Sequence, residues 1–176
     1  MAKEGVVKAR FKMSKHGGAK SSKQLARYGM HRADEKGERQ TRQMYDRGGT
    51  VTRQEAYERI DGAERQGYKY HYRLIVSMGE GHGGDMQSVT RDTMTMLSDR
   101  LGGRLDWVAV DHDDHSQHHH SHVIATTDRK LDTADLAAMR AEVGQSWERH
   151  NEPWREQFED RRANTERTMR EGGYER

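Results

Sequence analysis

The segment that most constrains the fold is residues 68–77, because its side chains alternate between two kinds along its whole length. Successive side chains of a β-strand point to opposite faces, so this alternation predicts a strand with one buried face and one face that lines a cleft. The face predicted to be buried carries Tyr68, Tyr70, Tyr72, Leu74 and Val76, and the opposite face carries Lys69, His71, Arg73, Ile75 and Ser77.

The rest of the chain alternates strand-like with helix-like segments. Further strands are expected at residues 5–12, 105–112 and 118–127. Helices are expected at about 23–31, from the Thr-x-x-Glu capping box of Thr52 to about 66, from Ser88 to Leu101, after Asp132 and after Pro153, with 33–50 as loop. This order predicts an α+β fold, with a central antiparallel sheet of about five strands, helices on one face and a cleft on the other.

Length and composition exclude several classes of protein. A chain of 176 residues is long enough for one domain with a core, but 31% hydrophobic and 34% charged residues make that core lean. The chain has no cysteine, which excludes disulfides, thiolate metal sites and cysteine nucleophiles. No signal peptide or membrane-spanning run is visible, so we expect a soluble, cytoplasmic protein without membrane insertion.

The charges are distributed unevenly although the net charge is only +2. Residues 1–50 contain 13 Lys and Arg against 5 Asp and Glu, whereas the remainder is net acidic. Lysine and arginine release the counterions condensed on nucleic acid, so a basic N-terminal third is typical of a phosphate-binding surface. The alternative is a solvated basic terminus without a partner.

Six of the eleven histidines lie between residues 112 and 122, directly before an apolar strand. On a strand, His120 and His122 point to the same face, and His112 at the end of the preceding strand can join them. Three neutral imidazoles suit a divalent ion and leave positions open for a phosphate oxygen. The pattern therefore predicts a metal site in the cleft; the alternative is an exposed histidine-rich loop.

The same segment resembles a known family. Leu105 to His112, with Asp114 and the His120-Ser121-His122 triplet followed by Val-Ile, is similar to the third motif of plasmid mobilization relaxases. These are HUH endonucleases, and the similarity is to the P-type branch that includes the T-DNA nickase. Residues 20–32 resemble the first motif of that family, and residues 70–77 with Thr90-Arg91-Asp92 resemble the second.

The resemblance implies site- and strand-specific nicking and rejoining of single-stranded DNA at a transfer origin during conjugative mobilization. It implies that Tyr28 is the nucleophile that forms a 5′-phosphotyrosyl intermediate, that Asp114 orients a ligand histidine, and that Ser77 contacts the DNA backbone. The implied metal ligands are His112, His120 and His122. Mn or Mg is the expected ion, with Zn, Co or Ni as alternatives.

The resemblance also implies partners and boundaries. We expect single-stranded DNA to be bound by basic side chains, and accessory DNA-binding and coupling proteins to act with the enzyme. Residues 1–150 would form the relaxase domain, and 151–176 a charged C-terminal helix that either ends a minimal relaxase or is the stub of a longer protein. The predicted DNA-binding side chains are Lys20, Lys23, Arg27, Arg32 and Arg73.

Several alternatives stay open. The spacer between His112 and His120 is longer than the family pattern, and a histidine replaces the usual proline, so His118 could take one ligand position. Tyr45 is a rival to Tyr28 as nucleophile. The function could also be that of a rolling-circle replication initiator of the same superfamily, or of a non-catalytic, metal-dependent DNA-binding protein. The oligomeric state is open.

Overall fold

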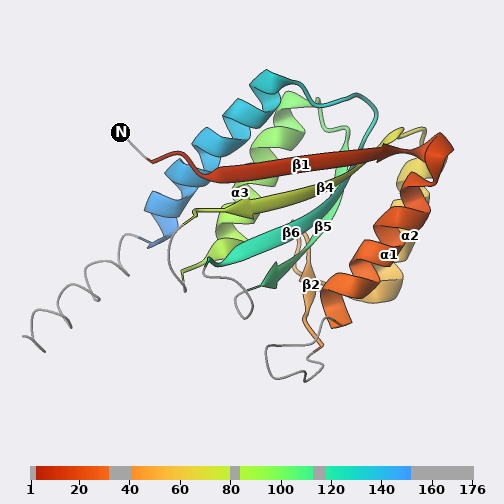
Figure 1. Cartoon of the computed structure of the whole chain (residues 1–176), viewed down its shortest axis with the longest axis horizontal. Coiled ribbons are helices and arrows are strands. Elements are labelled where there is room, and N and C mark those ends of the chain that lie inside the picture. Colours follow the sequence, from red (N-terminus) through yellow and green to blue (C-terminus); the bar gives the residue numbers. More distant parts are fainter. Residues whose placement is uncertain (1–2, 32–40, 80–83, 113–117, 152–176) are drawn as a thin grey trace, which may run out of the picture.

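The computed structural model describes residues 3–31, 41–79, 84–112 and 118–151, and the fold is α+β (Figure 1). Six strands form one sheet in the order β1-β4-β6-β5-β2-β3, and every neighbouring pair is antiparallel. The strands are β1 (Val6–Met13), β2 (Met44–Tyr45), β3 (Thr50–Val51), β4 (Tyr70–Ser77), β5 (Leu105–His112) and β6 (His120–Thr127). The helices are α1 (Gly18–His31), α2 (Arg53–Arg65), α3 (Met86–Arg100) and a last helix over residues 133–151, with a 3₁₀ turn η1 (Ser14–His16) before α1.

The four long strands expected from the sequence are confirmed, with boundaries shifted by at most two residues. The predicted loop at 33–50 was wrong in part, because β2 and the first residue of β3 lie inside it and the two strands form a short hairpin. These strands are too short to show an alternating pattern. The helix expected at 23–31 begins earlier, at Gly18.

Side-chain caps set two of the helix starts. The capping box is confirmed, since the Glu55 N–H donates to the Thr52 hydroxyl and Glu55 accepts from the Thr52 N–H. Asp85, not Ser88, caps α3 by accepting from the Ser88 N–H at 2.9 Å. An aspartate at that position satisfies N–H groups that the first helical turn leaves without intrahelical acceptors. The helix expected after Pro153 lies outside the described residues.

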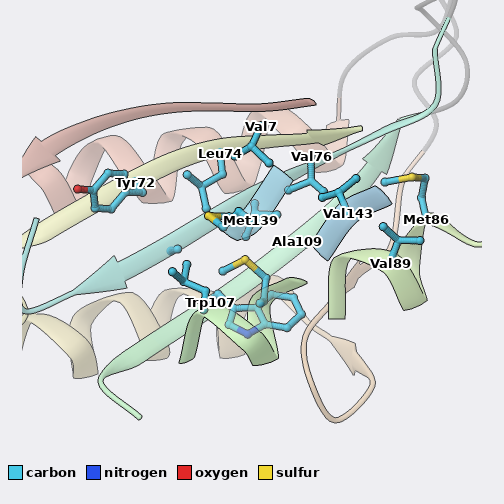
Figure 2. Close-up of a cluster of buried hydrophobic side chains, with 14 of the residues drawn as sticks. Val7, Tyr72, Leu74, Val76, Met86, Val89, Trp107, Ala109, Met139 and Val143 are labelled. Atoms are coloured by element: carbon cyan, nitrogen blue, oxygen red, sulfur yellow. The ribbon is translucent and has the colours of Figure 1, made fainter. Parts of the chain in front are cut away.

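Helices cover both faces of the sheet, so the prediction of helices on one face only was wrong. One core lies between the sheet and α3 with the 133–151 helix, and it contains Leu74, Val76, Trp107, Met139 and Val143 (Figure 2). A second core joins the opposite face to α1 and α2 through Ala26, Ile60, Val108, Val110 and Ile124. The sequence pattern misled because β5 and β6 are apolar on both faces, which is typical of strands buried between two layers.

The second helical layer does not cover the whole of its face. The two helices α1 and α2 lie side by side, and α1 begins over β4 and ends over β5 (Figure 1). The part of that face formed by β1 and the middle of β4 keeps exposed side chains, including Arg10 and Arg73. Within the part of the chain that the structure describes, no helix is both long and apolar enough to cross a membrane.

Candidate histidine site

The three histidines expected to bind metal lie together at one end of β5 and β6. The antiparallel register pairs His112 with His120 and Val110 with His122, so all three side chains are on the face covered in part by α1. The ring centroids are 4.7 Å apart for His112 and His122, 5.0 Å for His120 and His122, and 5.6 Å for His112 and His120. We call these three residues the histidine cluster.

Two members of the histidine cluster have the spacing of ligands on one ion. The Nε2 atoms of His120 and His122 are 3.3 Å apart. Two imidazole nitrogens bound tetrahedrally at ~2.0–2.1 Å from one ion would be separated by about 3.4 Å. Among the described residues, no group of three or more His, Cys, Asp or Glu side chains is arranged to hold one ion, so His112 as a third ligand stays a prediction.

The backbone orients the His120 ring. Its Nδ1 lies 3.0 Å from the carbonyl oxygen of His118, and because a carbonyl only accepts, this contact places the proton on Nδ1. The Nε2 lone pair of His120 is then directed toward His122. This is the arrangement found in metal sites, where the second ring nitrogen of a ligand histidine donates to a carbonyl or carboxylate.

The other histidines of the segment lie outside the histidine cluster. The strand expected to begin at His118, the alternative ligand, begins only at His120, and the His118 side chain is exposed in the bend before it. His119 lies near the opposite face, with Nε2 3.7 Å from Asp111 Oδ2. Asp114 and His115 lie outside the described residues, so the orienting role expected for Asp114 stays a prediction.

Tyr28 is carried to the neighbourhood of the histidine cluster by the last turns of α1. The next residue, Gly29, packs directly on β5: a Cβ added to it would lie 2.9 Å from Val110 Cγ1 and 4.0 Å from His112 Nε2. The Tyr28 side chain is 55% exposed and lines a groove between α1 and the sheet. A phenol that is open to solvent in this groove can be approached by a large substrate.

Tyr45, the rival nucleophile, lies on the other face of the sheet. It pairs with Ala109 in β2–β5, belongs to the core beneath α3 and is 2% exposed. Burial raises the pKa of Tyr45 well above its ordinary value of 10.0, and the nearby Asp111 carboxylate raises it further. Position and ionisation both disfavour Tyr45 as a nucleophile at the histidine cluster.

Ser77 pairs with His120 across β4 and β6 and lies on the same face as the histidine cluster. Its hydroxyl donates to the His119 carbonyl at 2.8 Å and accepts from the Gly79 N–H at 3.1 Å. The residue is 5% exposed. The hydroxyl therefore holds the backbone beside the ligand strand, and contact of Ser77 with DNA stays a prediction.

A row of cations lies beside the histidine cluster. The register of β1 and β4 places Lys8, Arg10 and Lys12 on the same face as Arg73 and Ser77, as the alternation of residues 68–77 predicted for the last two. Among the described residues, none of these four cations forms an ion pair with a carboxylate. We call Lys8, Arg10, Lys12 and Arg73 the basic row.

The basic row borders the groove between α1 and the sheet, which has a volume of about 460 Å³. Arg10, Lys12 and Arg73 line it from the sheet, and Gln24 and Tyr28 line it from α1. The buried His71 lies at the end of the groove near the start of α1, where its ring nitrogens contact the hydroxyls of Ser14 at 3.0 Å and Ser22 at 3.3 Å. Burial lowers the pKa of His71 below 6.5.

The basic residues of α1 expected to bind DNA do not line this groove. Lys20 and Arg27 are exposed on the outer side of the helix, and the Lys23 ammonium donates to Asp61 of α2 at 2.6 Å. Arg32 lies outside the described residues. Of the predicted DNA-binding side chains in the described part of the chain, only Arg73 faces the groove.

Sequence reasoning missed the contribution of β1. The signal was present, because Lys8, Arg10 and Lys12 alternate along a predicted strand. Their importance depends on pairing with β4, which is distant in sequence. Gly29 was also missed, since its role is visible only through its contact with β5.

Comparison of the chain with protein-family models, with curated proteins and with solved structures gives no match.

Proposed function

We propose that this protein is a metal-dependent endonuclease that nicks and rejoins single-stranded DNA through Tyr28, as a relaxase does. The observation that carries the proposal is the convergence of three features on one face of the sheet. These are the histidine cluster, the exposed phenol of Tyr28 and the basic row. A structural histidine cluster would require neither an accessible phenol nor a row of cations that has no acidic partner within the described residues.

The basic row supports a nucleic acid as the substrate. Strand positions of the same face are about 6.6–7 Å apart along a strand, which is close to the phosphate spacing of an extended single strand. Side chains on that repeat can follow successive phosphates and release their counterions. The exposed phenol and the partly buried Ile75 beside the row offer apolar surface on which bases can stack.

The proposed reaction is a transesterification at phosphorus. The phenolate oxygen of Tyr28 attacks phosphorus, the bond from phosphorus to the 3′ oxygen breaks, and that oxygen takes up the proton that the phenol loses. One phosphodiester bond is exchanged for another, so the reverse attack by the 3′ hydroxyl rejoins the strand. Water as the nucleophile would not conserve the bond.

The histidine cluster fits a divalent ion as cofactor. His120 and His122 would hold the ion at the spacing described above, and His112 would complete the set. Such an ion, when bound, stabilises negative charge on the phosphate oxygens. Neutral imidazoles accept Mn, Zn, Co or Ni, and the open positions that remain would suit phosphate oxygens.

The biological setting rests on the resemblance of the sequence motifs to mobilization relaxases. We propose that the cut is made at a transfer origin during plasmid mobilization, with accessory DNA-binding and coupling proteins as partners. In that setting a nick that keeps the protein attached to the 5′ end conserves the bond energy required for rejoining.

Covalent capture tests the proposed reaction. Random-sequence single-stranded oligonucleotides incubated with the protein and Mn²⁺ should give an adduct that survives SDS, and sequencing the captured strands identifies the preferred site. Tyr28→Phe should abolish the adduct, whereas Tyr57→Phe, a control on α2, should leave it unchanged. Free cleaved ends without an adduct would indicate a hydrolase, and metal-dependent binding without cleavage would indicate a non-catalytic DNA-binding protein.

A further inference from the structure

A polar network lies directly behind the histidine cluster, on the opposite face of the sheet, and three of its four members are buried. The hydroxyls of Tyr45 and Ser121 both donate to Asp111 Oδ1 at 2.6 Å, and they are 2.9 Å from each other. The Thr90 hydroxyl donates to Ser121 Oγ at 2.8 Å. We call Tyr45, Thr90, Asp111 and Ser121 the rear network.

The rear network alternates with the histidine cluster along the two ligand strands. Ser121 lies between His120 and His122 in β6, and Asp111 precedes His112 in β5. Ser121 and Asp111 are each joined through a peptide unit to a histidine of the cluster. Their side chains point to the other face because neighbouring side chains of a strand alternate. A displacement of Ser121 or Asp111 therefore changes the direction of the imidazoles on the other face.

The rear network ties these strand ends to two further elements. Tyr45 belongs to β2 and Thr90 to α3, while the β5–β6 ladder ends at the pair of His112 with His120. Terminal pairs of a ladder open more readily than interior pairs. Hydrogen bonds from β2 and α3 hold the last pairs in place, where the ligand nitrogens need a fixed separation.

The residues are well suited to a positional role. Thr90 and Ser121 are 0% exposed and Tyr45 is 2% exposed, so the hydroxyls are buried, while the Asp111 side chain that accepts from two of them is 21% exposed. A buried polar group without a partner is destabilising, and this makes the mutual arrangement of the hydroxyls and the carboxylate specific. An apolar packing at the same place would tolerate small shifts of the strands.

We infer that Tyr45, Thr90, Asp111 and Ser121 are positioning residues that set the geometry of the histidine cluster for its metal ion. The inference rests on the proposed function in assigning a metal to the cluster. It gives Asp111 a role beside the one expected for Asp114, and it gives Tyr45 a role other than nucleophile.

Matched variants separate positioning from ordinary stability. Thr90→Val and Thr93→Val both remove a hydroxyl from a fully buried threonine of α3, but Thr93 donates to Val89 O within the helix and lies outside the rear network. Tyr45→Phe and Tyr72→Phe both remove a hydroxyl from a buried tyrosine, and Tyr72 accepts from the Leu131 N–H instead. In each pair, both variants lose a hydroxyl group, but only one of the two residues belongs to the rear network.

The measurement is titration of each purified protein with Co²⁺, followed by the visible absorption of the bound ion, together with the urea midpoint of each variant. Thr90→Val and Tyr45→Phe should weaken Co²⁺ binding by about tenfold and change the absorption spectrum, as removal of groups that orient ligands does in other metal sites. Thr93→Val and Tyr72→Phe should retain the wild-type affinity and spectrum, even where their urea midpoints fall. Asp111→Asn, which keeps an acceptor for both hydroxyls, should bind Co²⁺ better than Asp111→Ala.

Two results with the variants would overturn the inference. One is wild-type Co²⁺ affinity and spectrum in both network variants, and the other is an equal decrease of affinity in the control variants. A wild-type protein that does not bind Co²⁺ would overturn the inference together with the metal site. A wild-type protein that binds Co²⁺, with weaker binding in the network variants, but forms no adduct with DNA would leave the inference standing and overturn the proposed function.

Discussion

Gly29 of α1 packs on β5 next to His112: a Cβ on Gly29 would be 4.0 Å from His112 Nε2, an ordinary contact, and 2.9 Å from Val110 Cγ1. The second distance is shorter than real Cβ contacts, and Val110 is 3% exposed and packed within the second core. The absence of a side chain at Gly29 therefore sets how near α1, and with it Tyr28, comes to the histidine cluster.

The first prediction concerns this contact. Gly29→Ala should push the end of α1 away from β5, costing about 1–3 kcal/mol of stability through overpacking. The larger effect should be on the yield of covalent DNA adduct, because Tyr28 moves with the helix. Gly62→Ala, in α2, is the control, since a Cβ there would meet only the flexible end of Arg65. Equal adduct yields for both variants would contradict the role of Gly29.

The second prediction separates two sets of cations. Arg10→Gln with Arg73→Gln should weaken binding of single-stranded DNA and lower the slope of log affinity against log salt by about 0.7 for each phosphate that is no longer neutralised. Lys20→Gln with Arg27→Gln, which removes the same charge from the outer side of α1, should have a smaller effect. Salt titrations of oligonucleotide binding measure both slopes. If Lys20→Gln with Arg27→Gln lowered the slope more, DNA would be bound by the outer side of α1, as the sequence predicted.

The third prediction is a pH dependence of stability due to His71. Burial lowers the pKa of His71 below 6.5 in the folded protein. The unfolded chain therefore binds the proton more readily, and the free energy of unfolding should fall as the pH drops below about 6.5. His71→Gln should reduce this slope, which urea titrations between about pH 5 and 8 can measure. A slope unchanged by the substitution would assign the pH dependence to other histidines.

The fourth prediction concerns the buried carboxylate of Asp135. Burial alone would raise its pKa, but hydrogen bonds from Arg129, the Asp132 N–H and Arg100 bring the pKa to about 2. Its stabilising contribution is present above the ordinary pKa of 3.8 and should be lost as the pH falls toward about 2. Asp135→Asn should lower the free energy of unfolding, measured by urea titration, by about 3 kcal/mol at neutral pH, because the paired arginines lose their charge partner. Asp132→Asn retains a capping acceptor, and its effect should be much smaller.

Much of the fold follows from local patterns in the sequence. The alternation of residues 68–77 determined the strand β4 and which of its faces carries Arg73 and Ser77, and the capping box determined the start of α2. The same local rule placed His120 and His122 on one face of β6. Period and capping depend on neighbours along the chain, and this is why these features could be predicted.

The features that pair distant segments were decided only by the tertiary structure. The register of β5 with β6 brings His112 to His120, the pairing of β1 with β4 places Lys8, Arg10 and Lys12 beside Arg73, and helices cover both faces of the sheet. The sequence left Tyr28 and Tyr45 as rivals, and the structure puts them on opposite sides of the sheet. The physical reason is that strand register and helix packing are set by burial of side chains far apart in the sequence, and no local period records which segments meet.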